Sequence, residues 1–167
     1  STPCGTLFPY TTLFRSNSPN ELKILIEMLR AVEVVPDTEL YDLIRKNDDG
    51  KWPIFLTAEM SSAIQQFVQR ETGVENFWCL LMDCPEFVEE AMELWQNILQ
   101  KKYDIMKTLP CDGFYQGENT STTMISPDYY QKYSLSHMRQ FTVAAHEAGV
   151  RNLVHMCGLL KDLIPLF

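Results

Sequence analysis

Basic residues are scarce in this 167-residue chain. Its 14 Lys and Arg residues stand against 22 Asp and Glu residues, which gives a formal net charge of −8 at pH 7, and the basic residues form no cluster. Nucleic-acid binding depends on a positively charged patch, so the sequence predicts no nucleic-acid partner. The chain also lacks the run of roughly 18 to 20 apolar residues that a membrane helix needs, so no membrane partner is expected.

Paired cysteines are missing as well. The five cysteines are odd in number and follow no paired spacing: Cys4, Cys79, Cys84, Cys111 and Cys157. Scattered thiols of this kind are typical of a reduced, cytoplasmic protein. With 46% hydrophobic and 22% charged residues, the composition is that of an ordinary globular domain.

The N-terminal string TLFPYTTLFRS, residues 6–16, is apolar but has neither the basic start nor the small-residue cleavage site of a signal peptide. It resembles the in-frame translation of a sequencing adapter in an assembled environmental sequence. We therefore assign no function to residues 1–16 and expect the natural domain to occupy residues 17–167, with the start of the natural gene product missing.

Helical and strand patterns alternate along the rest of the chain. Apolar spacing and capping residues predict helices over residues 21–32, 36–47, 61–73, 85–109 and 126–149, and the start of another over 159–167. Residues 74–83 are expected to form an apolar connection or a short helix. Three short apolar runs, 51–60, 111–119 and 151–158, predict strands, and the first suits burial on both faces. This order predicts an α/β fold with a parallel sheet, either a barrel or an open doubly wound sheet. Both place functional sites at the carboxyl ends of the strands.

The stretch RNLVHMCG, residues 151–158, carries two metal-ligating residue types on one face of a predicted strand. Side chains two positions apart on a strand point the same way, so His155 and Cys157 lie roughly 6–7 Å apart between Cα atoms. Imidazole nitrogen and thiolate sulfur are common zinc ligands, but two ligands do not make a site. The alternative is the end of a buried strand. Gly158 indicates that the backbone closely approaches another group at this point.

Two longer segments carry a family resemblance: GENTSTTMISPDYY through AAHEAG, and NLVHMCG after it. Together they resemble the uroporphyrinogen decarboxylase superfamily over roughly residues 38–167, and most closely its zinc-dependent corrinoid methyltransferases, because the tetrapyrrole decarboxylases lack the His-x-Cys pair. The resemblance implies that the chain is roughly half of a (β/α)8 TIM barrel, truncated at its C-terminus. It also implies that His155 and Cys157 bind zinc together with a cysteine much further along the chain.

The same resemblance implies that a methylated corrinoid, carried on a partner protein, gives its methyl group to a small thiol held by the zinc. Glu118, at the end of the preceding strand, is the candidate catalytic residue. It would bind substrate or orient a zinc ligand; the alternative is that it caps a loop or faces water. Gln116, on the same face of that strand, is a weaker candidate for cofactor binding. His137 and His146 are interpreted as surface or packing residues.

Two other functions stay open at this point. One is decarboxylation of a porphyrinogen, and the other is a corrinoid-pathway binding protein without turnover. The partial barrel itself is expected to be inactive, since it leaves a sheet edge and apolar surface unpaired.

Overall fold

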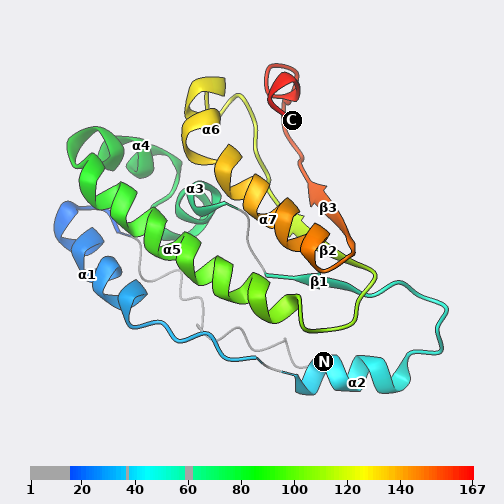
Figure 1. Ribbon diagram of the computed structural model, residues 1–167. Coiled ribbons are helices and arrows are strands. Elements are labelled where there is room, and N and C mark those ends of the chain that lie inside the picture. The colour runs from blue at the N-terminus through cyan, green and yellow to red at the C-terminus, as the bar shows by residue number, and fades with distance from the viewer. Residues whose placement is uncertain (1–15, 37, 59–61) are drawn as a thin grey trace.

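The computed structural model describes residues 16–36, 38–58 and 62–167. The adapter-like segment lies outside these residues except for Ser16. Three strands form a parallel sheet in the order β1 (Phe55–Thr57), β2 (Gly113–Gly117) and β3 (Arg151–His155), with helices between them (Figure 1). The predicted α/β class and the parallel sheet are confirmed.

The helices follow the predicted order with different boundaries. They are α1 (Pro19–Arg30), α2 (Glu39–Asn47), α3 (Ala63–Gln66) with the π-helical η1 (Phe67–Glu71), α4 (Val74–Asp83), α5 (Pro85–Met106), α6 (Pro127–Tyr133), α7 (Leu135–Glu147) and the 3-10 helix η2 (Ile164–Leu166). The predicted start at Ser126 is confirmed: its hydroxyl accepts a hydrogen bond from the backbone N–H of Tyr129, with Pro127 in the first turn. Across the described residues, none of these helices combines the length and apolar character needed to cross a membrane.

The register of the sheet fixes which side chains share a face. Leu56, Phe114 and Asn152 lie side by side in the three strands, and the next register position aligns Thr57, Tyr115 and Leu153. Phe114 is fully buried on the first face, where α5 and α7 pack. Leu153, on the second face, is 51% exposed. Within the described residues, helices therefore cover one face of the sheet.

This arrangement corrects the prediction for the first strand. The apolar run 51–60 suggested a strand buried on both faces, but β1 spans three residues, and Phe55 on the uncovered face is 43% exposed. Double burial needs a covering layer or a closed barrel on both sides, and the described part of the chain provides neither on one side.

Two predicted helices also differ from the structure. The helix predicted over 126–149 divides at Ser134, whose N–H still donates to the Tyr130 carbonyl at 2.9 Å, so the chain bends between α6 and α7 without unwinding. The helix predicted over 159–167 is a series of turns ending in η2. Pro165 contributes to this difference, because the residue before a proline is disfavoured in the α conformation.

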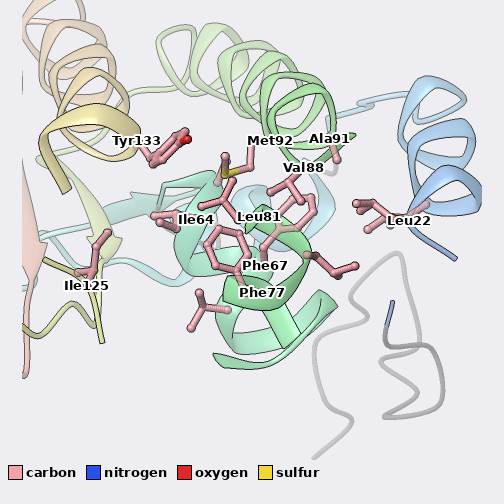
Figure 2. Close-up of a cluster of buried hydrophobic side chains, with 14 of the residues drawn as sticks. Leu22, Ile64, Phe67, Phe77, Leu81, Val88, Ala91, Met92, Ile125 and Tyr133 are labelled. Carbon is pink, nitrogen blue, oxygen red and sulfur yellow. The ribbon is translucent and has the colours of Figure 1, made fainter. Parts of the chain in front are cut away.

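The larger hydrophobic core lies beside the sheet. It joins the inner faces of α1, α3, η1, α4 and α5, where Phe67, Phe77 and Val88 are fully or almost fully buried (Figure 2). This core fixes the segment that follows β1, and with it the position of Ser62 at the start of α3.

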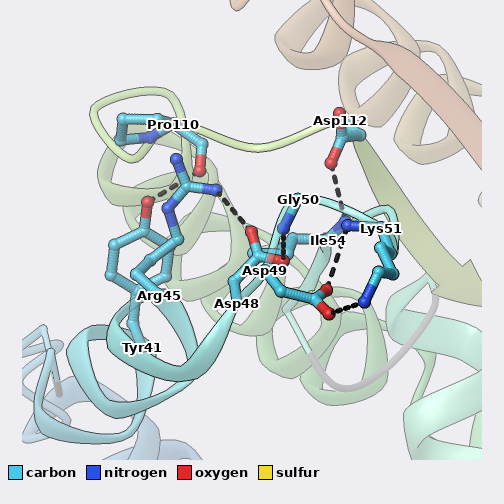
Figure 3. A network of polar contacts seen from close by, with 9 residues as sticks. All are labelled: Tyr41, Arg45, Asp48, Asp49, Gly50, Lys51, Ile54, Pro110 and Asp112. Carbon is cyan, nitrogen blue, oxygen red and sulfur yellow. Dashed lines mark hydrogen bonds and ion pairs between the residues drawn. The ribbon is translucent and has the colours of Figure 1, made fainter.

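Helix α2 has no buried residue and is attached by polar contacts (Figure 3). The Tyr41 hydroxyl donates to the Pro110 carbonyl at 2.7 Å. Next to this contact, the Asp112 carboxylate accepts from the Ile54 N–H at 2.7 Å, and the Asp112 N–H donates to the Ile54 carbonyl at 2.9 Å. These bonds align the amino ends of β1 and β2, at the opposite end of the sheet from His155.

Candidate functional site

His155 and Cys157 lie at the carboxyl end of β3, on the face of the sheet that no described helix covers. His155 is the last residue of β3 and pairs with Gly117 of β2. From Arg151 to Cys157 exposure alternates residue by residue, and both His155 and Cys157 are exposed. The alternation places the two side chains on the same side of the chain, and neither is sealed in a hydrophobic core.

The loop after β2 runs beside Cys157 and contacts it. The Cys157 thiol donates a hydrogen bond to Asn119 Oδ1 at 3.1 Å. One residue further along, a Cβ atom on Gly158 would lie 2.2 Å from the Thr120 carbonyl oxygen. The close backbone approach predicted at Gly158 is therefore confirmed, and the neighbouring group is the loop that follows Glu118.

The side chains of His155 and Cys157 offer the donor atoms that zinc prefers, but there are too few of them for a complete site. An imidazole and a thiol are typical zinc ligands, and a structural zinc site usually has four. Within residues 16–36, 38–58 and 62–167, no three His, Cys, Asp or Glu side chains are grouped so as to hold a metal ion. The other described cysteines lie on α4 (Cys79), before α5 (Cys84) and before β2 (Cys111). The described residues thus contribute two donors at this edge.

Glu118 lies at the same end of the sheet but points to the helix-covered side. It is fully buried, and its carboxylate accepts hydrogen bonds from the Ser62 N–H at 2.9 Å and the Ser62 hydroxyl at 2.8 Å. Its own N–H donates to the His155 carbonyl at 2.8 Å, which extends the ladder between β2 and β3 by one residue. These contacts tie Glu118 to the start of α3 and to the end of β3.

Two buried tyrosines lie within the electrostatic influence of Glu118. Burial first, and the negative charge of Glu118 second, raise the pKa of the Tyr103 and Tyr130 hydroxyls above the usual range. Both tyrosines therefore stay neutral at physiological pH.

Gln116 shares the buried face with Phe114 and lies opposite the face that carries His155. Its Nε2 atom lies 3.9 Å from Met138 Sδ on α7. The predicted grouping of Gln116 with Glu118 on one face agrees with the structure, but this face is not that of His155 and Cys157. The catalytic role of Glu118 and the cofactor-binding role of Gln116 stay predictions.

Sequence reasoning missed two residues near this edge, Asn119 and Ser62, whereas it interpreted His137 as a surface or packing residue. Asn119 directly follows Glu118 at a strand end, and that position is a signal that could have identified it. Ser62 lies 56 residues from Glu118 and carries no such signal. His137 is packed against the start of α3: its Nδ1 accepts from the Ala63 N–H at 3.4 Å, and burial lowers its pKa to about 4. His146, in contrast, is exposed near the end of α7, as predicted.

His137 also lines an open groove between α5 and the α6–α7 pair. The groove has a volume of about 470 Å³, and polar side chains including Glu93, Gln96 and Gln140 line it. It lies on the helical layer, away from the exposed face of the sheet.

The fold belongs to the mixed α/β class with a parallel sheet, and a comparison with solved structures agrees. The chain is similar to a methyltransferase from Methanosarcina mazei, with a TM-score of 0.57 and 12% sequence identity over 92% of this chain. The match covers 44% of that methyltransferase, so this chain spans less than half of its length. At this identity the similarity establishes the fold alone. No known protein family matches the chain, and no curated protein sequence matches it.

Proposed function

We propose that the chain forms part of a (β/α)8 barrel of the uroporphyrinogen decarboxylase superfamily. We further propose that the complete protein is a zinc-dependent methyltransferase, which moves a methyl group from a methylated corrinoid on a partner protein to a small thiol. The similarity to the Methanosarcina mazei methyltransferase supports the fold. A parallel sheet with helices on one face is what a segment of such a barrel contains, because the helices surround the barrel and the other face lines its interior.

The position of His155 and Cys157 carries the proposal. Both are exposed at the carboxyl end of β3, on the face without helices. In (β/α)8 enzymes this end of the strands holds the active site. Two side chains that had been turned to opposite sides, or buried among hydrocarbon, would not suit a shared metal ion.

In this function His155 and Cys157 are ligands, and neither is the nucleophile. A zinc ion bound to them would keep a substrate thiol in its thiolate form, the form that reacts with alkyl donors. The remaining ligand positions would be filled by the substrate and by a cysteine further along the complete chain. A cytoplasmic location belongs to the same proposal, because this chemistry requires reduced thiols.

In this function Glu118 acts indirectly, by positioning a metal ligand. Its carboxylate fixes the start of α3 through Ser62, and its N–H fixes the end of β3 through the His155 carbonyl. Glu118 therefore holds the backbone of a metal ligand in place from the buried side of the sheet.

Metal titration of a complete protein that contains this sequence tests the ligand assignment, because the proposed site includes a cysteine further along the complete chain. Co²⁺ replaces zinc and gives a thiolate-to-metal charge-transfer band when a cysteine coordinates it. We expect one bound Co²⁺ per complete chain, with a band that loses intensity in Cys157→Ser, and weaker Co²⁺ binding in both Cys157→Ser and His155→Ala. Cys79→Ser is the matched control, because Cys79 is also exposed but lies on α4. A complete wild-type protein that binds no metal, or a Co²⁺ affinity and band that are unchanged in Cys157→Ser, contradicts the proposal.

An activity assay of a complete protein that contains this sequence tests the reaction. Methylcobalamin and a small thiol are the substrates, and the methyl thioether is the product measured. Product formation that requires zinc supports the proposal. Turnover of uroporphyrinogen with no need for metal would assign the protein to the decarboxylases. Stable binding of a corrinoid protein without methyl transfer would indicate a protein without turnover.

A further inference from the structure

We propose that Asn119 is a positioning residue for Cys157, and that its side-chain amide holds the sulfur atom in the orientation in which it binds metal together with His155. The inference deepens the proposed function and depends on it for the metal. The contact itself, between the Cys157 thiol and Asn119 Oδ1 at 3.1 Å, does not depend on it.

The backbone around Asn119 and Cys157 makes the contact specific. The Leu159 N–H donates to the Ser121 hydroxyl at 3.2 Å, and the Thr122 N–H donates to the Leu159 carbonyl at 3.0 Å. Two residues before Cys157, the His155 carbonyl accepts from the Glu118 N–H at 2.8 Å. The loop after β2 and the segment after β3 are thus joined on both sides of the contact.

Gly158 brings these two segments to their shortest separation. Any side chain at this position would overlap the Thr120 carbonyl oxygen and Ser121, since a Cβ would lie 2.2 Å and 2.4 Å from their nearest atoms. The glycine lets the residue before it, Cys157, lie against the residue before Thr120, which is Asn119. The amide and the thiol therefore face each other because of the backbone path.

An amide suits both forms of the sulfur. In the metal-free chain the thiol is the hydrogen-bond donor and Asn119 Oδ1 accepts. When a metal ion replaces the thiol proton, the sulfur can only accept. An amide rotated by half a turn presents its N–H₂ group, a donor, at nearly the same place. Such second contacts orient metal ligands, and their loss typically weakens metal binding about 10- to 100-fold.

Aspartate is the informative substitution because it keeps the shape and loses the donor. Asn119→Asp can still accept from a thiol, but it cannot donate to a metal-bound sulfur, and its negative charge opposes a second one nearby. Asn119→Ala removes both interactions. Thr122→Ala removes a hydroxyl that donates to the Leu159 carbonyl at 3.1 Å, so it loosens the same loop without touching Cys157.

The first measurement is the Co²⁺ titration of the complete protein and of these three variants in it. We expect the dissociation constant to rise about 10-fold in Asn119→Ala and more in Asn119→Asp, with a displaced charge-transfer band. Thr122→Ala is expected to keep the wild-type band. If both Asn119 variants bind Co²⁺ with the affinity and the band of the wild type, the inference is wrong although the proposed function survives.

The second measurement needs no metal. Alkylation by iodoacetamide is followed at Cys157 and Cys79 in the same molecule by peptide mapping. We expect the ratio of the two rates to fall about fivefold in Asn119→Asp, because a carboxylate within hydrogen-bond distance disfavours the thiolate. A ratio unchanged in both variants overturns the inference. A changed ratio in a complete protein that binds no Co²⁺ supports the contact and rejects the proposed function.

Discussion

Glu118 and Ser62 are joined by two hydrogen bonds, although 56 residues separate them in the chain. The Ser62 N–H donates to Glu118 Oε2 at 2.9 Å, and the Ser62 hydroxyl donates to Oε1 at 2.8 Å. Both residues are fully buried. A buried carboxylate destabilises the folded state unless its oxygens are hydrogen-bonded, so the two bonds from Ser62 are needed at this position. They connect the carboxyl end of β2 to the start of α3.

The first prediction concerns the energy of this pair. We expect Glu118→Ala to lower the free energy of unfolding by about 2–4 kcal/mol and Ser62→Ala by about 1–2 kcal/mol. Since the residues act on each other, the double variant should lose less than the sum of the two. Urea denaturation measures all three, with the exposed Ser136→Ala as a control that changes little. Strictly additive losses would show that the two side chains do not interact in solution.

Sequence periodicity was sufficient to predict the strands but not the faces they present. The period-two pattern places Gln116 and Glu118 on one face of β2, and His155 and Cys157 on one face of β3. That these are opposite faces of the sheet follows from the pairing of Gly117 with His155, which is a property of the register. Because a shift of one residue in register exchanges the two faces, local pattern alone cannot decide the matter.

Local signals were reliable where a residue acts on its own neighbours. Ser126 and Pro127 predicted a helix start, and Gly158 predicted a close backbone approach, because both effects depend on residues near in sequence or on steric size alone. Ser62, in contrast, meets Glu118 only because the core around Phe67 positions the start of α3. Contacts of this kind depend on the whole fold and leave no mark in a short stretch of sequence.

The second prediction concerns Gly158. Its substitution by alanine would place a Cβ 2.2 Å from the Thr120 carbonyl oxygen, a backbone atom that cannot move without displacing the loop. We expect Gly158→Ala to destabilise the chain by about 1–3 kcal/mol, in the range of other overpacked sites. Gly117→Ala is the matched control, because a Cβ there would meet no atom within 4 Å. Thermal unfolding of both variants decides the question, and equal midpoints would contradict the prediction.

The third prediction concerns acid stability and His137. Burial lowers the pKa of its imidazole from 6.5 to about 4, so between these pH values the unfolded chain binds a proton that the folded chain does not. The free energy of unfolding should therefore fall as the pH drops through this window, by up to about 3 kcal/mol. Above pH 6.5, His137 should cause no further change of this free energy with pH.

Comparison of the wild type with His137→Gln isolates this contribution. The charged groups that line the same groove, Glu89, Glu93 and Lys132, are present in both proteins. Glu71 has its pKa raised by burial, so it contributes in the opposite direction, and it too is common to both. We expect the loss of stability between pH 6.5 and pH 4 to be smaller in His137→Gln when both are measured by urea denaturation. Parallel curves would show that His137 is accessible to protons in the folded chain.

The fourth prediction concerns the uncovered face of the sheet. Leu153 and Phe55 lie on this face, and β3 is an edge strand of the sheet formed by the described residues. An exposed apolar face beside an open edge favours association with other chains, so we expect sedimentation velocity to show self-association that increases with concentration. Leu153→Lys should weaken it, because a charge on this face opposes burial. Val143→Lys is the control, since Val143 is 53% exposed but lies on α7 in the helical layer. If Val143→Lys weakens association and Leu153→Lys does not, the contact lies on the helices, and the face that carries His155 is not the surface through which chains meet.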